Sequence, residues 1–141
     1  MSNPYKVVFA CVHNAGRSQM AASLFNKLAD PAVAVAVSAG THPAPRVHPE
    51  VVTVMKEMGI DLSRTRPRIL TDEIARHARA LITMGCGDEC PVVPGARRED
   101  WPLADPAGQS LETVRRTRDE IAERVRQLVE SEQWARVASR P

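Results

Sequence analysis

The sequence is poor in aromatic residues, has no long hydrophobic run and carries almost no net charge. Phe, Trp and Tyr together make up 4% of its 141 residues, too few to suggest a surface on which nucleic-acid bases stack. The net charge of +2 is too small to indicate binding to nucleic acid or to an anionic membrane. No apolar run reaches the roughly 18 residues that a membrane-spanning helix needs. We therefore expect no nucleic acid and no membrane among the partners.

Targeting signals, internal repeats and low-complexity linkers are also missing. The first ten residues, MSNPYKVVFA, lack the basic segment and the apolar stretch of a secretory signal. Hydrophobic and charged residues, at 43% and 26%, have the proportions of an ordinary globular protein. A chain of this length corresponds to one domain, which needs no disulfide or metal to fold. We expect one folded domain over residues 1–130 and a frayed tail over residues 131–141.

Cysteine is scarce, and its three copies are Cys11, Cys86 and Cys90. An odd number of cysteines without a secretory signal indicates a reducing compartment, the cytoplasm, and thiols that are retained for their reactivity. Buried cysteines also serve simply as small hydrophobic residues. The number of cysteines leaves both interpretations open.

Short apolar runs alternate with helical periodicity along the chain. Apolar runs predict four strands, over Tyr5–Ala10, Ala32–Val37, Ala80–Met84 and Arg97–Trp101. Apolar residues at helical spacing predict a helix from Arg17 that ends before Pro31, one through Val51, Met55 and Met58, a short one over Thr71–His77 and a long one from Leu111 to Leu128. This alternation predicts an α/β fold with a largely parallel sheet. Ligands of such sheets bind beyond the carboxyl ends of the strands.

The loop after the first predicted strand carries the strongest chemical signal. It reads CVHNAGRS over residues 11–18 and leads directly into a predicted helix. A short turn into a helix directs several backbone N–H groups at one point, where they bind a tetrahedral oxyanion. We therefore predict an oxyanion-binding loop made of Val12, His13, Asn14, Ala15, Gly16 and Arg17.

The residue types in this loop suit a nucleophile beneath an oxyanion cradle. Gly16 allows a close approach of the backbone, and Asn14 tolerates a left-handed conformation. Arg17 can hold two oxyanion oxygens with its planar guanidinium. The positive surroundings favour the nucleophilic thiolate of Cys11, to which Ser18 can donate a hydrogen bond. The alternatives are a structural turn with a surface arginine and, for His13, a base or metal ligand instead of a residue that shapes the turn.

These residues resemble the low-molecular-weight protein tyrosine phosphatases, and still more their thioredoxin-coupled arsenate reductase relatives. The strings CVHNAGRSQM from residue 11, SAGTHPA from residue 38 and Asp105-Pro106 fit the common pattern. The string TMGCGDEC, residues 83–90, fits the reductase branch. The resemblance covers the chain from about Tyr5 to Val129. It implies a four-stranded parallel sheet flanked by helices.

The resemblance also implies an activity, the reduction of arsenate to arsenite by a relay of three thiols. Cys11 would attack arsenic, Cys86 and Cys90 would resolve the intermediate, and thioredoxin or a similar thiol carrier would regenerate the enzyme. Phosphate and sulfate would compete with arsenate. A glutaredoxin-like protein with a low-molecular-weight thiol is the other possible electron donor. Two alternatives to a resolving role remain for Cys86 and Cys90. They could be structural thiols, or they could bind zinc together with His77 or His42.

The resemblance assigns the role of general acid to Asp105, although an Asp-Pro pair by itself is usually a turn. The phosphatases commonly follow this pair with aromatic residues, whereas Ala107-Gly108-Gln109 follows here. That difference favours a small inorganic substrate. The alternative functions are a phosphatase acting on small phosphate esters and a binding module that senses oxyanions or redox state.

A potassium site of the reductase branch is not matched by this sequence. Many such reductases use a Glu of the first helix and an Asp before the third strand, where this chain has Ala22 and Arg68. Asn14 and Ser38 remain from that site. We therefore predict no cofactor and no metal. Arg68 would either supply the positive charge itself or belong to a solvated run, Arg64–Arg68.

Overall fold

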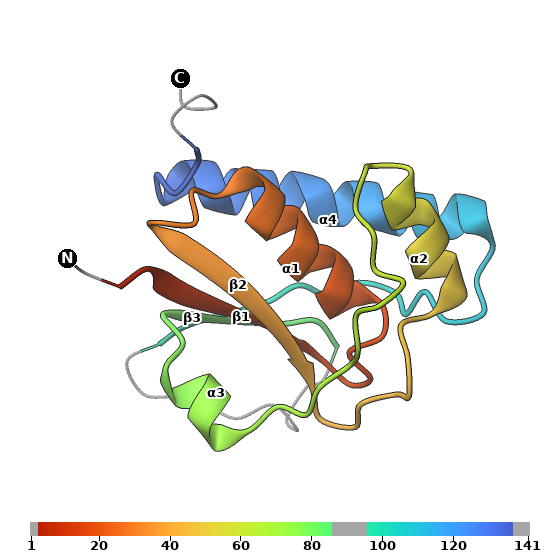
Figure 1. Cartoon of the computed structure of the whole chain (residues 1–141), viewed down its shortest axis with the longest axis horizontal. Coiled ribbons are helices and arrows are strands. Elements are labelled where there is room, and N and C mark those ends of the chain that lie inside the picture. The colour runs from red at the N-terminus through yellow and green to blue at the C-terminus, as the bar shows by residue number, and fades with distance from the viewer. Residues whose placement is uncertain (1–2, 86–95, 137–141) are drawn as a thin grey trace.

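A computed structural model describes residues 3–85 and 96–136 (Figure 1). Its four strands are β1 (Tyr5–Cys11), β2 (Ala34–Gly40), β3 (Ala80–Thr83) and β4 (Arg97–Asp100). They form one parallel sheet in the order β2-β1-β3-β4. The predicted four-stranded parallel sheet flanked by helices is confirmed.

Helices cover both faces of this sheet. They are α1 (Arg17–Leu28), α2 (Pro49–Lys56), α3 (Asp72–Arg76) and α4 (Leu111–Ser131). Figure 1 shows α1, α2 and α4 on one side of the sheet and α3 on the other. None of these helices, within the described part of the chain, is long and apolar enough to span a membrane.

The central strand β1 is buried on both faces. Val7 and Phe9 belong to the large core cluster shared with α1, α2 and α4, whereas Val8 and Ala10 belong to a smaller cluster on the α3 side. All four side chains are fully buried. A strand that is buried on both faces has a continuous run of apolar residues, and this run is why the position of β1 could be predicted from the sequence. Its last residue, Cys11, emerges at the carboxyl edge of the sheet.

The second strand begins later than predicted. Ala32 and Val33 belong to a turn that precedes the strand. In this turn, the Asp30 carboxylate accepts from the Ala32 N–H at 2.9 Å, and the Asp30 carbonyl accepts from the Val33 N–H at 2.9 Å. The strand instead extends to Gly40, which pairs with Cys11. The prediction of Ala32–Val37 was therefore wrong at both ends. The apolar run AVAVAV does not reveal that its first two residues belong to the turn after Asp30.

The helix α2 is attached to α4 by ion pairs. Glu57, at the end of α2, accepts from Arg115 Nη2 at 2.7 Å and from Arg118 Nη1 at 2.8 Å. The hydrogen bond from Arg115, followed by that from Arg118, lowers the pKa of Glu57 from 4.5 to about 2. Arg118 also donates to the Val54 carbonyl at 2.8 Å. These contacts hold the position of α2 and of the residues that precede it.

The chain packs against the domain as far as Arg136, beyond the boundary at residue 130 suggested by the sequence. Trp134 is 5% exposed, and its ring centroid lies 6.0 Å from those of both Tyr5 and Phe25. Its carbonyl accepts from the Asp30 N–H at 2.8 Å. The helical spacing of apolar residues ends with α4. Trp134 lies beyond it and packs against residues that are distant in the sequence, so no pattern around Trp134 predicts its burial.

Replacing Trp134 with alanine should lower the free energy of unfolding by about 3 kcal/mol, because a large buried side chain leaves a cavity. Urea unfolding followed by circular dichroism would measure the change. Leu111→Ala is a suitable control, since Leu111 is 39% exposed, and it should cost under about 1 kcal/mol. Equal stability of Trp134→Ala and the wild type would contradict the packing described for residues 132–136.

Candidate active site

The loop between β1 and α1 turns its carbonyl groups outward. Every carbonyl oxygen from Cys11 to Gly16 accepts a hydrogen bond from a neighbouring segment. The backbone N–H groups of Thr41, His42, Ala44 and His48 donate to the carbonyls of Cys11, Val12, His13 and Ala15 at 3.3, 2.8, 2.9 and 2.9 Å. The Gln19 side-chain amide donates to the Asn14 carbonyl at 3.0 Å, and the Met20 N–H donates to the Gly16 carbonyl at 3.0 Å. The segment over residues 41–48 thus supports the loop from outside.

The backbone N–H groups of the same loop remain available. Within the described residues, none of those from Val12 to Arg17 donates a hydrogen bond to the protein. Asn14 adopts a left-handed conformation with φ of 50°, which curls the loop. A curled loop with free N–H groups at a helix N-terminus is a cup for an oxyanion. We call residues 12–17 the oxyanion cup.

Cys11 lies beneath this cup in a polar network. Its side chain is 2% exposed, and Sγ lies 2.9 Å from Ser18 Oγ. Ser18 Oγ accepts from Asn14 Nδ2 at 2.7 Å, so the proton of Ser18 is free to point at the sulfur. A hydroxyl that donates to sulfur stabilises a thiolate. The arrangement suits a nucleophile that attacks a ligand in the cup.

Arg17 and Asp105 meet at the cup from opposite ends of the sequence. Arg17 is 8% exposed and donates from Nη1 to the Leu103 carbonyl at 2.9 Å. Its Nη2 lies 3.9 Å from Asp105 Oδ2, and the Asp105 side chain is 42% exposed. The second oxygen of Asp105 accepts from the Ala107 N–H at 3.0 Å. The structure therefore brings Cys11, Arg17, Ser18 and Asp105 together.

Two glycines allow this close assembly. A β-carbon on Gly16 would lie 2.5 Å from Pro106 Cγ, so the Asp-Pro segment packs directly on the cup. A β-carbon on Gly85, whose φ is 98°, would lie 2.4 Å from Arg17 Nη1. Gly85 thus leaves room for the guanidinium, a role that sequence reasoning missed. The signal was a glycine directly after the third predicted strand.

Gln19 is a second residue that sequence reasoning missed. Its buried amide donates at 3.0 Å both to the carbonyl of Asn14 and to Asn14 Oδ1. These bonds hold Asn14 in its left-handed conformation. The residue lies in the first turn of α1, where a glutamine is indistinguishable from an ordinary helix former.

The described residues at the place where many related reductases hold potassium do not fit a potassium ion. Asn14 Oδ1 already accepts from Gln19 Nε2 at 3.0 Å and from the Arg68 backbone N–H at 2.9 Å. Ala22 is buried and brings no oxygen. The Arg68 side chain lines a hollow of about 260 Å³ beside Val37 and α3. The contribution of Arg68 to the cup is its backbone N–H.

Cys86 and Cys90 lie outside the described residues, so their predicted resolving role, the zinc site and the structural-thiol alternative all stay untested. Among the residues that the structure does describe, no three His, Cys, Asp or Glu side chains form a group that could hold a metal ion. His77, one of the histidines of the zinc alternative, places its Nδ1 2.9 Å from the Glu73 carbonyl.

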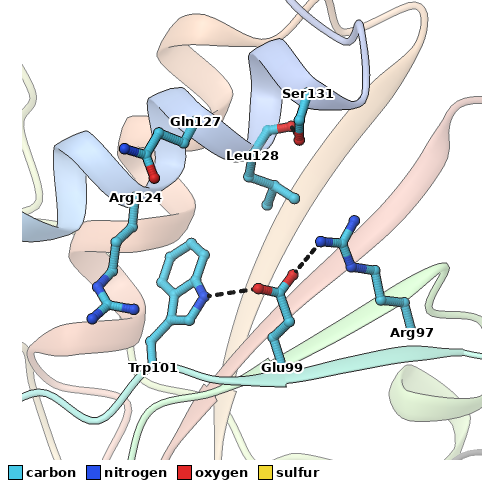
Figure 2. A pocket seen from close by; sticks show the side chains of 7 residues that line it. All are labelled: Arg97, Glu99, Trp101, Arg124, Gln127, Leu128 and Ser131. Atoms are coloured by element: carbon cyan, nitrogen blue, oxygen red, sulfur yellow. Dashed lines mark hydrogen bonds and ion pairs between the residues drawn. The ribbon is translucent and has the colours of Figure 1, made fainter.

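A larger hollow lies away from the cup. Figure 2 shows it between β4 and α4, with Trp101 and Leu128 beside the paired side chains of Arg97 and Glu99. Its volume is about 320 Å³. Among the residues that the structure describes, neither Cys11 nor any residue of the cup lines this hollow, so the predicted oxyanion chemistry is not assigned to it.

The comparison with family models decides the family. The model for low molecular weight phosphotyrosine protein phosphatases matches residues 6–138. The chain belongs to this family. The resemblance seen in the sequence of the loop and of Asp105-Pro106 is thereby confirmed for the low-molecular-weight phosphatase family as a whole.

Within this phosphatase family, the chain is similar to arsenate reductases. The glutaredoxin arsenate reductase of Synechocystis is 39% identical over 127 residues, which are 88% of this chain and 95% of that protein. Arsenate reductase 2 of Staphylococcus saprophyticus is 34% identical over 131 residues, 89% and 96% of the two chains. The structure of the thioredoxin-dependent arsenate reductase of Corynebacterium glutamicum matches with a TM-score of 0.81 at 42% identity, over 94% of this chain and 63% of that one. The chain thus spans less than two thirds of the last protein.

Proposed function

We propose that this chain reduces arsenate to arsenite with Cys11 as the nucleophile. The observation that carries the proposal is the oxyanion cup, whose N–H groups donate to no described residue and which directly follows the buried Cys11. Arsenate is a tetrahedral dianion, and its oxygens suit a ring of such donors together with an arginine. The similarity to proteins named arsenate reductases supports arsenate as the oxyanion.

In the first step, the Cys11 thiolate attacks the arsenic of HAsO₄²⁻ and forms a sulfur–arsenic bond. The hydroxyl of arsenate leaves as water after Asp105 transfers a proton to it. Arg17 and the N–H groups of the cup hold the three oxygens that remain and stabilise their charge. The Ser18 hydroxyl, whose oxygen lies 2.9 Å from the sulfur, holds the Cys11 side chain in place for the attack.

In the second step, the Cys86 thiolate attacks the Cys11 sulfur and forms a disulfide. The electron pair of the broken sulfur–arsenic bond passes to arsenic, which leaves as arsenite in the trivalent state. Cys90 then attacks the Cys86 sulfur, releases the Cys11 thiolate and becomes part of a Cys86–Cys90 disulfide. The protein has given up two electrons, equal to those that arsenic gained.

A dithiol carrier returns these two electrons by reducing the Cys86–Cys90 disulfide. Thioredoxin and a glutaredoxin with a low-molecular-weight thiol both supply this chemistry, and the names of the relatives include one of each kind. Reduced thiols persist in the cytoplasm, where we place the reaction.

A phosphatase acting on small phosphate esters is the second candidate. The family and the cup support it, because phosphate is held by the same donors as arsenate. The segment after Asp105-Pro106 speaks against aryl esters, since Ala107, Gly108 and Gln109 are exposed and none is aromatic. Three cysteines are also more than hydrolysis needs.

The direct test supplies arsenate with thioredoxin, thioredoxin reductase and NADPH, and measures arsenite together with NADPH oxidation. Glutaredoxin with glutathione replaces thioredoxin in a second arm, and para-nitrophenyl phosphate hydrolysis is measured in a third. We expect catalytic arsenite release in one of the first two arms. Hydrolysis of the ester without arsenite in either reducing arm would favour the phosphatase.

Asp105→Asn should slow the chemical step by roughly 10²–10⁴-fold, because the leaving oxygen then receives no proton from residue 105. Oxyanion binding should change much less, since the free N–H groups of the cup are unaltered. Rapid-quench measurement of one turnover isolates the chemical step. An unchanged rate in that measurement would leave Asp105-Pro106 as a structural turn.

Gly85→Ala should weaken oxyanion binding on the order of 10-fold, because a β-carbon displaces the Arg17 guanidinium that holds the ligand. Competition of phosphate with arsenate would measure it. Gly59→Ala is a matched control, since Gly59 also has a positive φ, of 77°, but its β-carbon would meet nothing within 4 Å. If both variants bind phosphate like the wild type, the contact between Gly85 and Arg17 has no part in binding.

A further inference from the structure

His48 stands at the rim of the oxyanion cup and has no part in the steps described above. It is half-buried and precedes α2 at the N-cap position, yet its side chain makes no capping hydrogen bond. Within residues 3–85 and 96–136, its ring nitrogens have no hydrogen-bond partner in the protein. The unpartnered ring nitrogens are not among the buried side-chain atoms that lack a partner, so they reach solvent and are accessible to a ligand that enters the cup.

The backbone of His48 is fixed to the cup. Its N–H donates to the Ala15 carbonyl at 2.9 Å, and α2, which follows it, is held to α4 through Glu57. The imidazole therefore projects from an anchored position. A ring on such an anchor loses little conformational freedom when it binds a ligand.

The ring edge that faces the cup carries nitrogen. The point where a Gly16 β-carbon would stand is 3.5 Å from His48 Cδ2 and 2.5 Å from Pro106 Cγ. Cδ2 is bonded to Nε2, and turning the ring by 180° exchanges Cδ2 with Nδ1 without changing its outline. Under either assignment, a ring nitrogen lies at the edge that borders Gly16.

We infer that His48 is a specificity-determining residue that donates a hydrogen bond to the outermost oxygen of an oxyanion held above Cys11. This inference rests on the oxyanion function proposed above. The N–H groups of the cup and Arg17 would bind the oxyanion oxygens nearest the loop. His48 and Pro106 both lie beside Gly16, at the rim of the cup. A polar ring at that place favours a small ligand with an oxygen there over an ester that carries an aryl group.

The test measures ligand binding at Cys11 without relying on turnover. Iodoacetamide alkylates the fully reduced protein in the presence of increasing phosphate or phenylphosphonate, and trypsin then releases Cys11 in the peptide of residues 7–17, apart from Cys86 and Cys90 in residues 80–97. The concentration that halves the alkylation rate of Cys11 reports the affinity for each ligand. His48→Asn and His48→Phe are compared with the wild type, and His77→Asn, directly after α3 on the other side of the sheet, is the control.

In both His48 variants, we expect the half-protecting phosphate concentration to rise about ten-fold, because one hydrogen bond to a charged ligand is lost. Asparagine at an N-cap bonds the helix backbone instead, so thermal unfolding of His48→Asn should be unchanged or raised. His48→Phe keeps a ring at the rim, and its affinity for phenylphosphonate should not fall. His77→Asn should behave like the wild type.

Equal protection by phosphate in the wild type and in both His48 variants would overturn the inference. Full affinity in His48→Phe alone would also overturn it, because the ring would then act only through its shape. Failure of the proposed oxyanion function gives a different result, since phosphate would then fail to protect Cys11 in the wild type itself.

Discussion

Cys11→Ser is expected to abolish arsenite release and any hydrolysis of phosphate esters together. One thiolate starts both reactions, and a serine hydroxyl is neither ionised at neutral pH nor able to supply electrons to arsenic. The loss should extend to the detection limit. Arsenite quantification and para-nitrophenyl phosphate hydrolysis on the same preparation would measure it.

The same variant should keep the oxyanion cup, because the N–H groups from Val12 to Arg17 belong to the backbone. Phosphate should therefore still raise its thermal unfolding temperature, as a ligand that binds the folded state does. This stabilisation is the control for folding. Arsenite formation at the wild-type rate by Cys11→Ser would remove Cys11 from the nucleophile's role.

The second large effect is expected to separate Cys86 from Cys90. Cys90→Ser should release one equivalent of arsenite and then stop as a Cys11–Cys86 disulfide, because Cys86 alone resolves the first intermediate. Cys86→Ser should release no arsenite even in the first turnover, since the relay requires attack by Cys86 on the Cys11 sulfur. The two variants carry the same chemical change four positions apart, so each is the matched control of the other.

Disulfide mapping after one equivalent of arsenate would check the order of exchange. In Cys90→Ser, the tryptic peptide of residues 7–17 should be joined to that of residues 80–97, which then holds a single cysteine. In the wild type, the second peptide should instead carry an internal disulfide. A Cys11–Cys90 disulfide as the first product would reverse the two roles. Multiple turnover by both variants would refute the relay and favour resolution by an external thiol.

The sequence by itself determined the strand–loop–helix unit that carries Cys11, the proposed nucleophile. The buried run before Cys11, the loop residues and the helix that follows are contiguous, so apolar patterning and residue chemistry are enough to recognise them. Asp105 was different. Its spacing from Cys11 carries no geometric information, and only the resemblance to a family assigned it a role.

Tertiary structure decided how distant segments complete the cup. Leu103 orients Arg17 from 86 residues away, and Arg68 donates to Asn14 from 54 residues away. The room that Gly85 leaves for Arg17 and the place of His48 at the rim depend equally on which segments meet at the sheet edge. Local patterns encode neighbours along one strand or helix, whereas these contacts depend on strand order and register. The burial of Trp134 against Tyr5 and Phe25 has the same cause, because the core that covers it is assembled from both ends of the chain.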